Sequence, residues 1–550
     1  MKHYTLDQVQ QHNSVDKRAL VVIDQQVYDV TEFLDEHPGG KKVLLNAAGT
    51  DASDKFWQFH NKSVLEKVAK PLLVGTIGQD SAAGDTQAEA SAPSHASEEK
   101  ESQEHAEDDG AVDDLDETYF GDLVPFGDPF WYQDWSSPYY NASHIKVRRA
   151  IREFTDTYLT PNAYEWDQAK EIPPSEYKRI ADAGILCAIA AGGSGWPDEQ
   201  YSKGIPVPGG IDKNEWDAFH NLILLDELSR CASGGIMYGL LGGFGISIGP
   251  ILAFGTDELK SRLVGPLLRG EIRSCLAITE AEGGSDVANL TREAKKTDDG
   301  KHYIVNGAAK WITNGIYSDV FVTAVRTGGK GMGGISLVVV ERQHGGLKTR
   351  KMECMGVLAS GTSYVDFEDV KVPVGNLLGK ENKGFMLIMH NFSGERAGIV
   401  IQANRFARVC LEESIKYAAK RKTFGKPMIE HPVIRAKMAE MGRRIESTHA
   451  WLESIVYQSL HHDPDTLTLR GGGTMALLKA HATDTFAFCA REACQIFGGL
   501  SYTKGGQAEK VERLYREVLA YTIPGGSSEI MLDIGVRQSI KVAQIMGAKL

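Results

Sequence analysis

Ser274-Cys-Leu-Ala-Ile-Thr-Glu-Ala-Glu-Gly-Gly-Ser-Asp286, followed by Lys310-Trp-Ile-Thr-Asn-Gly315, is the most informative part of this 550-residue chain. Alternating segments such as Tyr303-Ile-Val-Asn-Gly307 lie between the two motifs and are typical of strands closed by glycine turns. Strands of this kind bring distant motifs side by side. We therefore expect one side of a flat, hydrogen-bonding ring to be lined by the Gly-Gly-Ser turn, the hydroxyls of Thr279 and Thr313 and the indole of Trp311.

The charge of the chain is concentrated in one segment. The formal net charge is −13, and residues 80–117 hold 14 acidic side chains and one lysine, so the remainder is neutral. This segment has no aromatic residue and is rich in Ala, Ser, Glu and Asp, a composition that cannot bury enough surface to fold. We interpret it as an acidic disordered linker, with a docking segment for a basic partner as the alternative. The negative charge argues against nucleic-acid binding.

Length and composition indicate an intracellular protein of three or four domains. The seven cysteines include no Cys-x-x-Cys pair, which favours reduced and mostly buried thiols. Residues 234–254 are uncharged and long enough to span a bilayer, but seven glycines and Pro250 favour a buried helix, so we expect no membrane span. The N-terminus has no apolar core typical of a signal peptide. Because no Gly-x-Gly-x-x-Gly follows a strand, a nicotinamide cofactor is not supported.

Residues 1–79 have the pattern of a small α+β domain. Residues 21–30 predict two short strands around a turn, and short helices are expected at 31–40, 41–48 and 52–59. His37 and His60 each stand at the end of such a helix, with apolar residues between them. Two helical hairpins of this kind can hold a flat apolar ring between two imidazoles.

This domain resembles cytochrome b5 through the segments Tyr28-Asp-Val-Thr-Glu-Phe33 and His37-Pro-Gly-Gly40. The resemblance implies that His37 and His60 are the axial ligands of a haem b iron. Because no Cys-x-x-Cys-His is present, this haem is expected to bind without covalent attachment. Two protein ligands leave the iron no open position, so such a haem carries single electrons.

After the linker, composition and periodicity predict three further domains. An aromatic-rich stretch opens a helical domain over 118–271, with helical apolar spacing at 144–160, 175–183 and 212–230. Residues 272–383 are rich in predicted strands, for example at 335–340 and 363–367. From residue 384 to 550 the pattern is that of long helices.

The motifs in this region are similar in order and spacing to those of the acyl-CoA dehydrogenase family. Members carry Thr-Glu-x-x-x-Gly-Ser-Asp, which matches Thr279–Asp286, and then Trp-x-Thr-Asn-Gly, which matches Trp311–Gly315. The resemblance runs from about Tyr119 to the C-terminus. It implies an all-α N-terminal domain, a middle domain built as a β-sheet or barrel, and a C-terminal four-helix bundle. It also implies FAD as the cofactor and an acyl-CoA as the substrate.

The resemblance further implies that a glutamate removes the proton alpha to the thioester while flavin N5 takes hydride from the beta carbon. Many members carry this glutamate in a C-terminal Glu-Gly-Thr turn, but Gly525 stands at the matching place in Ile523–Ile530. The long-chain and isovaleryl branches carry it in an earlier Glu-Arg pair, which matches Glu395-Arg396. We therefore predict Glu395 as the base and the Gly525 N–H as a donor to the thioester carbonyl. The alternatives are that Glu395 is an exposed carboxylate at a helix start, or that Glu529 is the base.

Cofactor and substrate contacts also follow from the resemblance. Arg421–Lys426 resembles the segment that reaches FAD from a neighbouring subunit, and Arg421 suits a pyrophosphate, with a solvated helix face as its alternative role. A shared cofactor implies an obligate homo-oligomer, for which the family suggests a tetramer. Ser285 and Arg396 are expected to contact the substrate. The residues expected to bind FAD are Ile278, Thr279, Gly284, Ser285, Trp311, Thr313, Arg421, Thr423, Phe424, Gln495, Gly499, Ser527 and Glu529.

Together these expectations predict an FAD-dependent acyl-CoA dehydrogenase that passes electrons to its own tethered haem or to an external acceptor. The alternatives are an oxygen-reducing oxidase of the same fold, a related flavoenzyme acting on a substrate without CoA, and a non-catalytic flavin–haem binding protein. The final Ala548-Lys-Leu550 is similar to the peroxisomal address Ser-Lys-Leu, which predicts a peroxisomal enzyme of fatty-acid β-oxidation. Cytoplasm and mitochondrion are the alternative locations.

Overall fold

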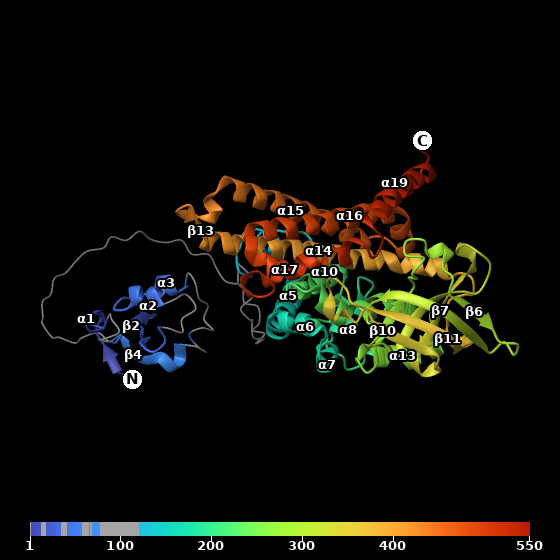
Figure 1. Ribbon diagram of the computed structural model, residues 1–550, viewed down its shortest axis with the longest axis horizontal. Helices are drawn as coiled ribbons and strands as arrows, with labels where there is room; N and C mark the ends of the chain where they lie inside the picture. The colour runs from blue at the N-terminus through green and yellow to red at the C-terminus, as the bar shows by residue number, and fades with distance from the viewer. Residues whose placement is uncertain are drawn as a thin grey trace, which may run out of the picture. The chain divides into compact units, whose positions relative to one another are not determined.

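The computed structural model describes residues 2–12, 18–34, 41–57, 65, 69–77 and 120–549 (Figure 1). The chain divides into two compact units, Met1–Gly110 and Ala111–Leu550. Each unit has its own hydrophobic core, built from strands and short helices in the first and from long helices and a large sheet in the second.

A four-stranded sheet in the order β1-β4-β3-β2 forms the centre of the N-terminal unit. The predicted strand pair is confirmed, because β2 (Leu20–Ile23) and β3 (Gln26–Asp29) run antiparallel around a tight turn. Two of the predicted helices are also present. The remaining elements are β1 (Lys2–Tyr4), α1 (Leu6–Gln10), α2 (Lys41–Ala47), α3 (Ser53–Trp57) and β4 (Leu73–Ile77).

The helix predicted over residues 31–40 is wrong in its first part, where Thr31–Leu34 forms a turn. The Thr31 backbone N–H and hydroxyl both bond to the Asp29 carboxylate, at 3.1 and 2.5 Å. Such local bonds compete with helical ones, which explains the turn. Residues 35–40, and with them His37, lie outside the described residues, as does His60.

A helical domain opens the second unit, as predicted. The sequence positions with helical apolar spacing form α5 (Ala142–Phe154), α7 (Pro174–Asp182) and α10 (Ala218–Ser229), whose apolar faces share one core. α5 begins two residues before the predicted start at 144 and continues as a π-helical turn over Thr155–Leu159. The other helices of this domain are α6 (Ala163–Ala169), α8 (Ile185–Ala191), α9 (Glu199–Ser202) and α13 (Asp257–Leu268).

The apolar stretch 234–254 is a bent core helix. It consists of α11 (Gly234–Ile236), the π-helical segment η9 (Met237–Gly242) and α12 (Gly243–Phe254). By length and composition alone it could cross a membrane, and 61% of its most apolar window is buried inside the protein. Its side chains belong to the main hydrophobic core of the second unit, together with those of strands and long helices. A core helix passes the same test of length and apolarity, so the test is weak evidence for a span.

Eight strands form the middle domain. They are β5 (Ser274–Ala277), β6 (Glu293–Lys296), β7 (His302–Ile312), β8 (Val320–Arg326), β9 (Ile335–Glu341), β10 (Leu347–Lys351), β11 (Ser363–Pro373) and β12 (Leu377–Leu378). Their order is β10-β11-β7-β6-β8-β9-β12, with β5 paired to β8 in parallel. Because the two end strands do not pair in the described chain, the sheet is open and the barrel alternative is wrong.

Gly307 lies inside a strand and does not close one, contrary to the prediction. β7 continues through it from His302 to Ile312, and the partner strand β11 shifts register opposite this point, between Phe367 and Val370. The φ of Gly307 is 132°, and a Cβ there would stand 2.9 Å from the Arg292 backbone. The glycine therefore allows the irregular pairing and the close approach of β6.

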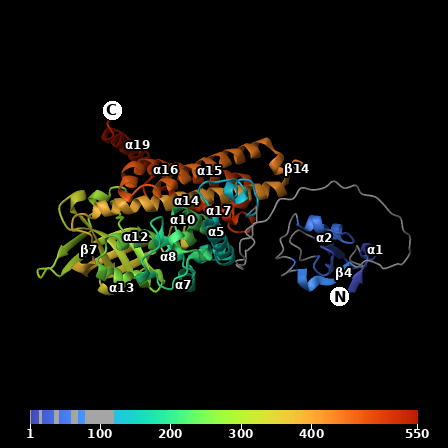
Figure 2. The same cartoon turned by 180° about the vertical axis from the view of Figure 1, so that it is seen from behind.

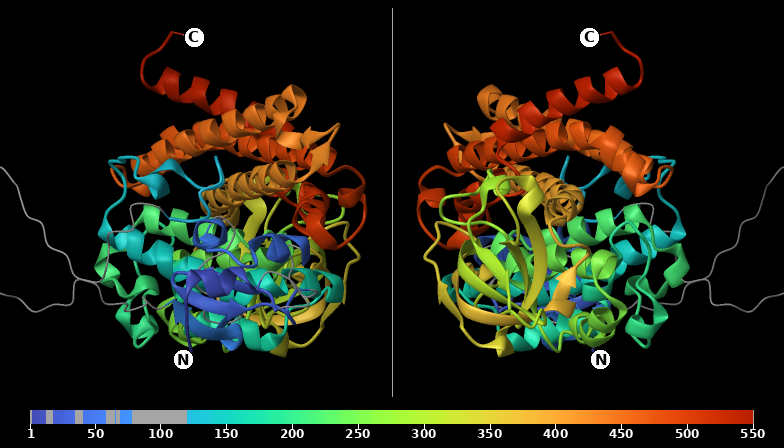
Figure 3. Two further views of the ribbon diagram at one scale, coloured as in Figure 1. Left: turned by 90° about the vertical axis from the view of Figure 1, so that its left-hand side faces the viewer. Right: turned by 90° about the vertical axis from the view of Figure 1, so that its right-hand side faces the viewer.

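Long helices make up the C-terminal domain, as predicted. α14 (Gly384–Lys420) runs between the bundle and the other two domains, packing on α10, α12 and β9 as well as on α15 and α16 (Figure 2). The end-on views in Figure 3 show the helices stacked above the sheet, with the C-terminal end of the chain projecting beyond them. The remaining helices are α15 (Pro432–Ser459), α16 (Pro464–Phe497), α17 (Glu509–Glu517), α18 (Leu519–Thr522) and α19 (Ser528–Ile545). A small hairpin, β13 (Lys422–Thr423) with β14 (Lys426–Pro427), joins α14 to α15.

Candidate active site

Glu395 lies within the N-terminal third of α14, where this helix passes α12. Its side chain is largely enclosed, and its Oε1 accepts a hydrogen bond of 2.8 Å from Asn391 Nδ2. Burial raises the pKa of Glu395 to about 8, although the neighbouring Arg396 charge and the Asn391 hydrogen bond act to lower it. The alternative of an exposed carboxylate at a helix start is therefore wrong. A carboxylate with this pKa suits proton abstraction near neutral pH.

The turn with Gly525 lies directly against the Glu395 segment of α14. Arg396 Nε donates to the Gly525 carbonyl at 2.9 Å. The φ of Gly525 is 68°, and a Cβ there would stand 2.8 Å from Ile399 Cδ1. The two positions that the family uses for its glutamate thus meet at one place, although 130 sequence positions separate them.

Lys479 of α16 anchors this turn and was not found from the sequence. Its side chain is fully buried, and Nζ donates to the carbonyls of Thr522 and Gly526 at 2.8 and 2.7 Å. Burial and, to a smaller extent, the nearby Arg396 charge lower the pKa of Lys479 to about 8. The only sequence signal is a single lysine in an otherwise apolar helical stretch, Met475–Ala480. A buried ammonium between two carbonyls fixes the path of the backbone on both sides of Gly525.

The two motifs singled out from the sequence also come together. The Lys310 backbone N–H donates to the Thr279 carbonyl at 2.9 Å, which joins the end of β7 to the segment after β5. Trp311 follows with a φ of 59° and a ring that is 48% exposed. The hydroxyls of Thr279 and Thr313 bond to no protein group in the part of the chain that the structure describes. An exposed indole beside two free hydroxyls is suited to a flat ring with polar edges.

Asn314 ties the second motif to the bent core helix and was also missed. Its Oδ1 accepts from the Gly243 N–H at 2.9 Å, and its Nδ2 donates to the carbonyls of Tyr238 and Ser360 at 3.0 and 2.8 Å. A Cβ on Gly242 would stand 3.2 Å from Thr313 Cγ2 and 3.4 Å from Tyr238. Burial raises the pKa of the Tyr238 phenol, and the charges of Glu517 and Glu395 raise it as well. These contacts place Thr313 against the bent core helix, next to Tyr238.

The glutamate of the first motif, Glu280, is structural. Its carboxylate accepts from the Thr291 N–H and hydroxyl and from the Arg292 N–H, at 2.7 to 2.8 Å. The buried Arg292 guanidinium donates to the carbonyls of Ala277 and Ile278 at 2.8 and 3.1 Å. This pair therefore holds the backbone just before Thr279. Ile278 itself is 5% exposed, so its side chain belongs to the core and only its backbone can face a cofactor.

The Gly-Gly-Ser turn projects from the domain. Gly284 and Ser285 are both exposed, and a Cβ added to Gly284 would meet nothing within 4 Å. The loop is therefore open to a ligand that approaches from solvent.

The other predicted nucleotide contacts lie at the far end of α14. Glu395 and Arg421 are separated by 26 positions, almost all helical, which corresponds to roughly 40 Å. Phe424 in the β13–β14 hairpin is 97% exposed, and the Arg421 guanidinium has no partner among the described residues. The stacked rings of Tyr417 and Phe497, 4.4 Å apart, bring the end of α16 to the same place. The members of this distant group are Arg421, Thr423, Phe424, Gln495 and Gly499.

Ser527 and Glu529 lie at the start of α19, next to the anchored turn. Ser527 is the N-cap residue, and Glu529 is exposed in the first helical turn. Hydrogen bonds from its own backbone and from Ser527 lower the pKa of Glu529. A carboxylate with a lowered pKa holds a proton weakly and is therefore a poor base, which argues against the Glu529 alternative.

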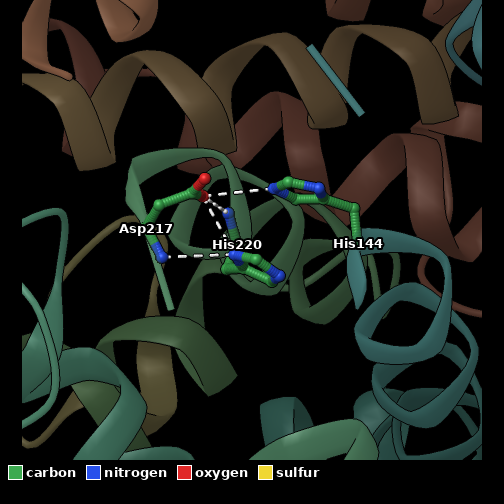
Figure 4. Close-up of side chains that lie close together, drawn as sticks. All are labelled: His144, Asp217 and His220. Atoms are coloured by element: carbon green, nitrogen blue, oxygen red, sulfur yellow. Dashed lines mark hydrogen bonds and ion pairs between the residues drawn. The ribbon is translucent and has the colours of Figure 1, made fainter. Parts of the chain in front are cut away.

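A cluster of His144, Asp217 and His220 has the composition of a metal site (Figure 4). Asp217 Oδ1 lies 3.1 Å from His144 Nε2 and 2.9 Å from His220 Nδ1. The two imidazoles are stacked 3.9 Å apart and 18° from parallel, so their in-plane lone pairs do not converge on one ion. The other ring nitrogen of each imidazole is also bonded, His144 Nδ1 to Asn141 and His220 Nε2 to Ser143. Asn141 and Asp217 are the N-caps of α5 and α10, so we assign the cluster to helix capping.

Comparison with known proteins decides the family. The family models named acyl-CoA dehydrogenase N-terminal, middle and C-terminal domain match residues 141–271, 275–370 and 382–540. The acyl-CoA dehydrogenase AFT10-1 of Alternaria alternata is 39% identical over 425 residues, which cover 77% of this chain and 97% of that protein. The chain belongs to the acyl-CoA dehydrogenase family. This acyl-CoA dehydrogenase also carries an N-terminal match, residues 5–78, to the cytochrome b5-like haem/steroid binding domain.

Other relatives and solved structures agree. The acyl-CoA dehydrogenase apdG of Emericella nidulans is 38% identical over 429 residues, covering 78% of this chain and 98% of that protein. The acyl-CoA dehydrogenase structure from Geobacillus kaustophilus superposes with a TM-score of 0.64 at 30% identity, over 73% of this chain and 99% of that one. The butyryl-CoA dehydrogenase structure from Megasphaera elsdenii superposes with a TM-score of 0.65 at 27% identity, over 74% of this chain and 100% of that one. The predicted architecture and enzyme class, an oxidoreductase acting on CH–CH bonds, are thereby confirmed.

The two cofactors of this enzyme are FAD and haem, and the described residues fit both. The free Thr279 and Thr313 hydroxyls, the half-exposed Trp311 ring and the open loop at Gly284 offer a flavin the contacts it needs. In the N-terminal unit, Leu44, Leu45 and Phe56 are only partly buried beside the core, so apolar surface is available there for a flat apolar ring such as haem.

Proposed function

We propose that this enzyme introduces an α,β double bond into an acyl-CoA thioester and that Glu395 removes the α proton. One observation carries the assignment: Arg396 and Ile399, one and four positions after the enclosed Glu395 on α14, both lie against the Gly525 turn. The carboxylate at 395 is thus adjacent to the place where other members carry theirs, and Gly525 leaves that second place without a charge. Two carboxylates this close would oppose each other's ionisation.

The residues around Glu395 have different roles in the proposed reaction. Oε1 is held by Asn391, and Oε2 has no partner among the described residues, so Oε2 is the atom that receives the proton. Arg396 and Lys479 hold the backbone around Gly525 from both sides, so its N–H can donate to the thioester carbonyl and acidify the α proton. Bound FAD supplies the acceptor for the hydride that leaves the β carbon. The proton and the hydride account for both hydrogens lost from the substrate.

The pH dependence of substrate oxidation tests this assignment. Only the ionised carboxylate can accept the proton, so kcat/KM is expected to rise with pH and to reach half of its plateau near pH 8, the pKa of Glu395 in the free enzyme. The measurement is the initial rate with a saturating dye acceptor between pH 6 and about 9.5. A flat profile through this range, or one with a midpoint near the ordinary carboxyl pKa of about 4.3, contradicts the proposal.

We further propose that the electrons pass to the haem of the N-terminal domain. The support is the fusion itself: the linker of residues 80–117 keeps the haem domain at an effective concentration on the order of millimolar around the flavin domain. Bound haem supplies a one-electron acceptor. An alternative recipient is oxygen, as in an oxidase, and another is a separate protein.

Anaerobic mixing with acyl-CoA distinguishes these recipients. The haem absorption bands are expected to shift to those of the ferrous form after the flavin band bleaches, with a rate that does not depend on protein concentration, because the transfer occurs within one molecule. The control is the same enzyme without its first 117 residues, mixed with the separate haem domain, where the rate should rise with concentration. A haem that stays ferric after the flavin has bleached contradicts the transfer, and stoichiometric peroxide in air would favour an oxidase.

A neighbouring subunit is part of the proposed site. A single chain cannot bring Glu395 and Arg421 to one FAD molecule, because roughly 40 Å of helix separates them. A second copy of the chain can supply the Arg421–Phe424 hairpin, whose exposed phenyl ring and free guanidinium would then be covered. We therefore propose a homo-oligomer, with a tetramer as the expected state.

A further inference from the structure

Asn391 stands between the proposed base and the bent core helix. Its Nδ2 donates one hydrogen to Glu395 Oε1 at 2.8 Å and the other to the Ile246 carbonyl of α12 at 2.9 Å. Both partners are acceptors, so the amide can have only one orientation. Both of its hydrogens are used, and the Glu395 carboxylate is thereby connected to a second helix.

The Ile246 carbonyl is available because of Pro250. In a regular helix, the carbonyl of residue 246 would accept from the N–H of residue 250, four positions later. Pro250 has no N–H, so α12 leaves this carbonyl without its usual partner. Gly249 provides the space, since a Cβ there would stand 3.1 Å from Asn391 Oδ1. The Gly249-Pro250 pair of α12 thus provides both the free carbonyl acceptor and the space that the Asn391 amide occupies.

Few charged or titratable groups face the Glu395 carboxylate. Arg396 on the same helix and Tyr238 on η9 interact with it, and Lys479 of α16 acts on Arg396. Burial is the largest influence on its pKa and raises it, whereas Arg396 and the Asn391 hydrogen bond lower it. Asn391 is the one group of this set that donates a hydrogen bond to the carboxylate.

We propose that Asn391 is a positioning residue for the base: held by the carbonyl that Pro250 leaves free, it fixes the rotamer of Glu395 and stabilises its ionised form. The inference rests on the proposed role of Glu395. Because Oε1 is held, Oε2 is the oxygen directed to the substrate. A hydrogen bond to a carboxylate favours the anion, so Asn391 keeps a larger share of the base ionised at neutral pH.

Replacing Asn391 with leucine removes both donors at nearly constant volume. The midpoint of the pH profile of kcat/KM is expected to move up by about one to two units, as the loss of one charge-assisted hydrogen bond implies. The rate at pH 7 should fall by roughly tenfold or more, and KM should change little. The matched control is Asn404→Leu on the same helix, because Asn404 is 1% exposed and its amide has no hydrogen-bond partner among the described residues. Its pH midpoint should not move.

The variant Asn391→Leu/Pro250→Ala separates positioning from stability. Alanine at 250 returns an N–H to the Ile246 carbonyl, so this double variant leaves no backbone acceptor unpaired and should recover the thermal stability that Asn391→Leu loses. The shifted pH midpoint should remain in the double variant. If the midpoint returns to that of the parent, the role of Asn391 is only structural and the proposal is wrong.

Infrared difference spectroscopy gives a readout without turnover. The protonated-carboxyl band that Glu395→Gln removes can be titrated in the resting holoenzyme, with and without Asn391. A higher midpoint in Asn391→Leu supports the inference, whether or not Glu395 proves to be the base. An unchanged midpoint overturns it. If instead Glu395→Gln keeps full turnover, the proposed base is wrong while the infrared result still decides the Asn391 contact.

Discussion

Replacing Glu395 with glutamine is expected to lower the rate of substrate-dependent flavin bleaching by about 10³-fold, within the range of 10² to 10⁴ typical for a general base. The amide has nearly the shape of the carboxylate but cannot accept the proton. Asn391 can still donate to its oxygen, so the fold around α14 should persist. Stopped-flow absorbance measures the rate, and the visible spectrum shows whether FAD is retained.

Glu517→Gln is the matched control for this change. Glu517 is fully buried, and burial raises its pKa to about 7, but its carboxylate bonds to the N–H groups of Gly234 and Gly235 and not to the site. This variant should lose some thermal stability and keep its turnover. Flavin bleaching at the parent rate in Glu395→Gln, with the pH midpoint unchanged, would remove Glu395 as the base. A non-catalytic binding protein would show no bleaching in the parent either.

Two inactive variants are expected to restore activity when they assemble together. Arg421→Glu should lose FAD, since a carboxylate would repel the pyrophosphate that Arg421 is proposed to bind. In a mixed dimer with Glu395→Gln, one site carries both changes and the other carries neither. Dimers isolated through a different tag on each subunit should therefore show about half of the parent activity per site.

The recovery depends on the separation of Glu395 and Arg421 along α14. Each variant assembled with itself is the control, and both should stay inactive. If both residues belonged to one site within a single chain, each subunit of the mixed dimer would carry one of the two changes, and neither site would be intact. Absence of recovery in assembled, FAD-supplemented mixed dimers would therefore contradict the shared site.

The sequence predicts the principal residues of the site because each belongs to a short motif. Glu395 and Gly525 are recognisable from their immediate neighbours, and the structure brings them together. Lys479, Asn314 and Asn391 were missed because their importance depends on distant carbonyl groups, at Thr522 and Gly526, at Tyr238 and Ser360, and at Ile246. A single lysine or asparagine in the sequence gives no sign of such a partner.

The sequence predicted the elements that have a long apolar period, and the prediction failed where local hydrogen bonds decide the backbone conformation. α14 and the strand pair β2–β3 follow from their apolar patterns. The turn at Thr31 follows instead from two hydrogen bonds to Asp29. Gly307 is a glycine because the Arg292 backbone comes too close for a side chain, and not because a strand ends there. Whether the sheet closes also depends on contacts between strands far apart in sequence, which no local pattern reveals.

The backbone at Gly525 restricts how the carboxylate proposed as the base could move between the two positions during evolution. Any residue with a side chain at 525 must adopt a left-handed φ of 68° and would collide with the tip of Ile399. A protein with this backbone that carried its glutamate at 525 would need at least a smaller residue than Ile399, in addition to the replacement of Glu395. The present arrangement is therefore separated from its alternative by several coordinated substitutions, each unfavourable alone.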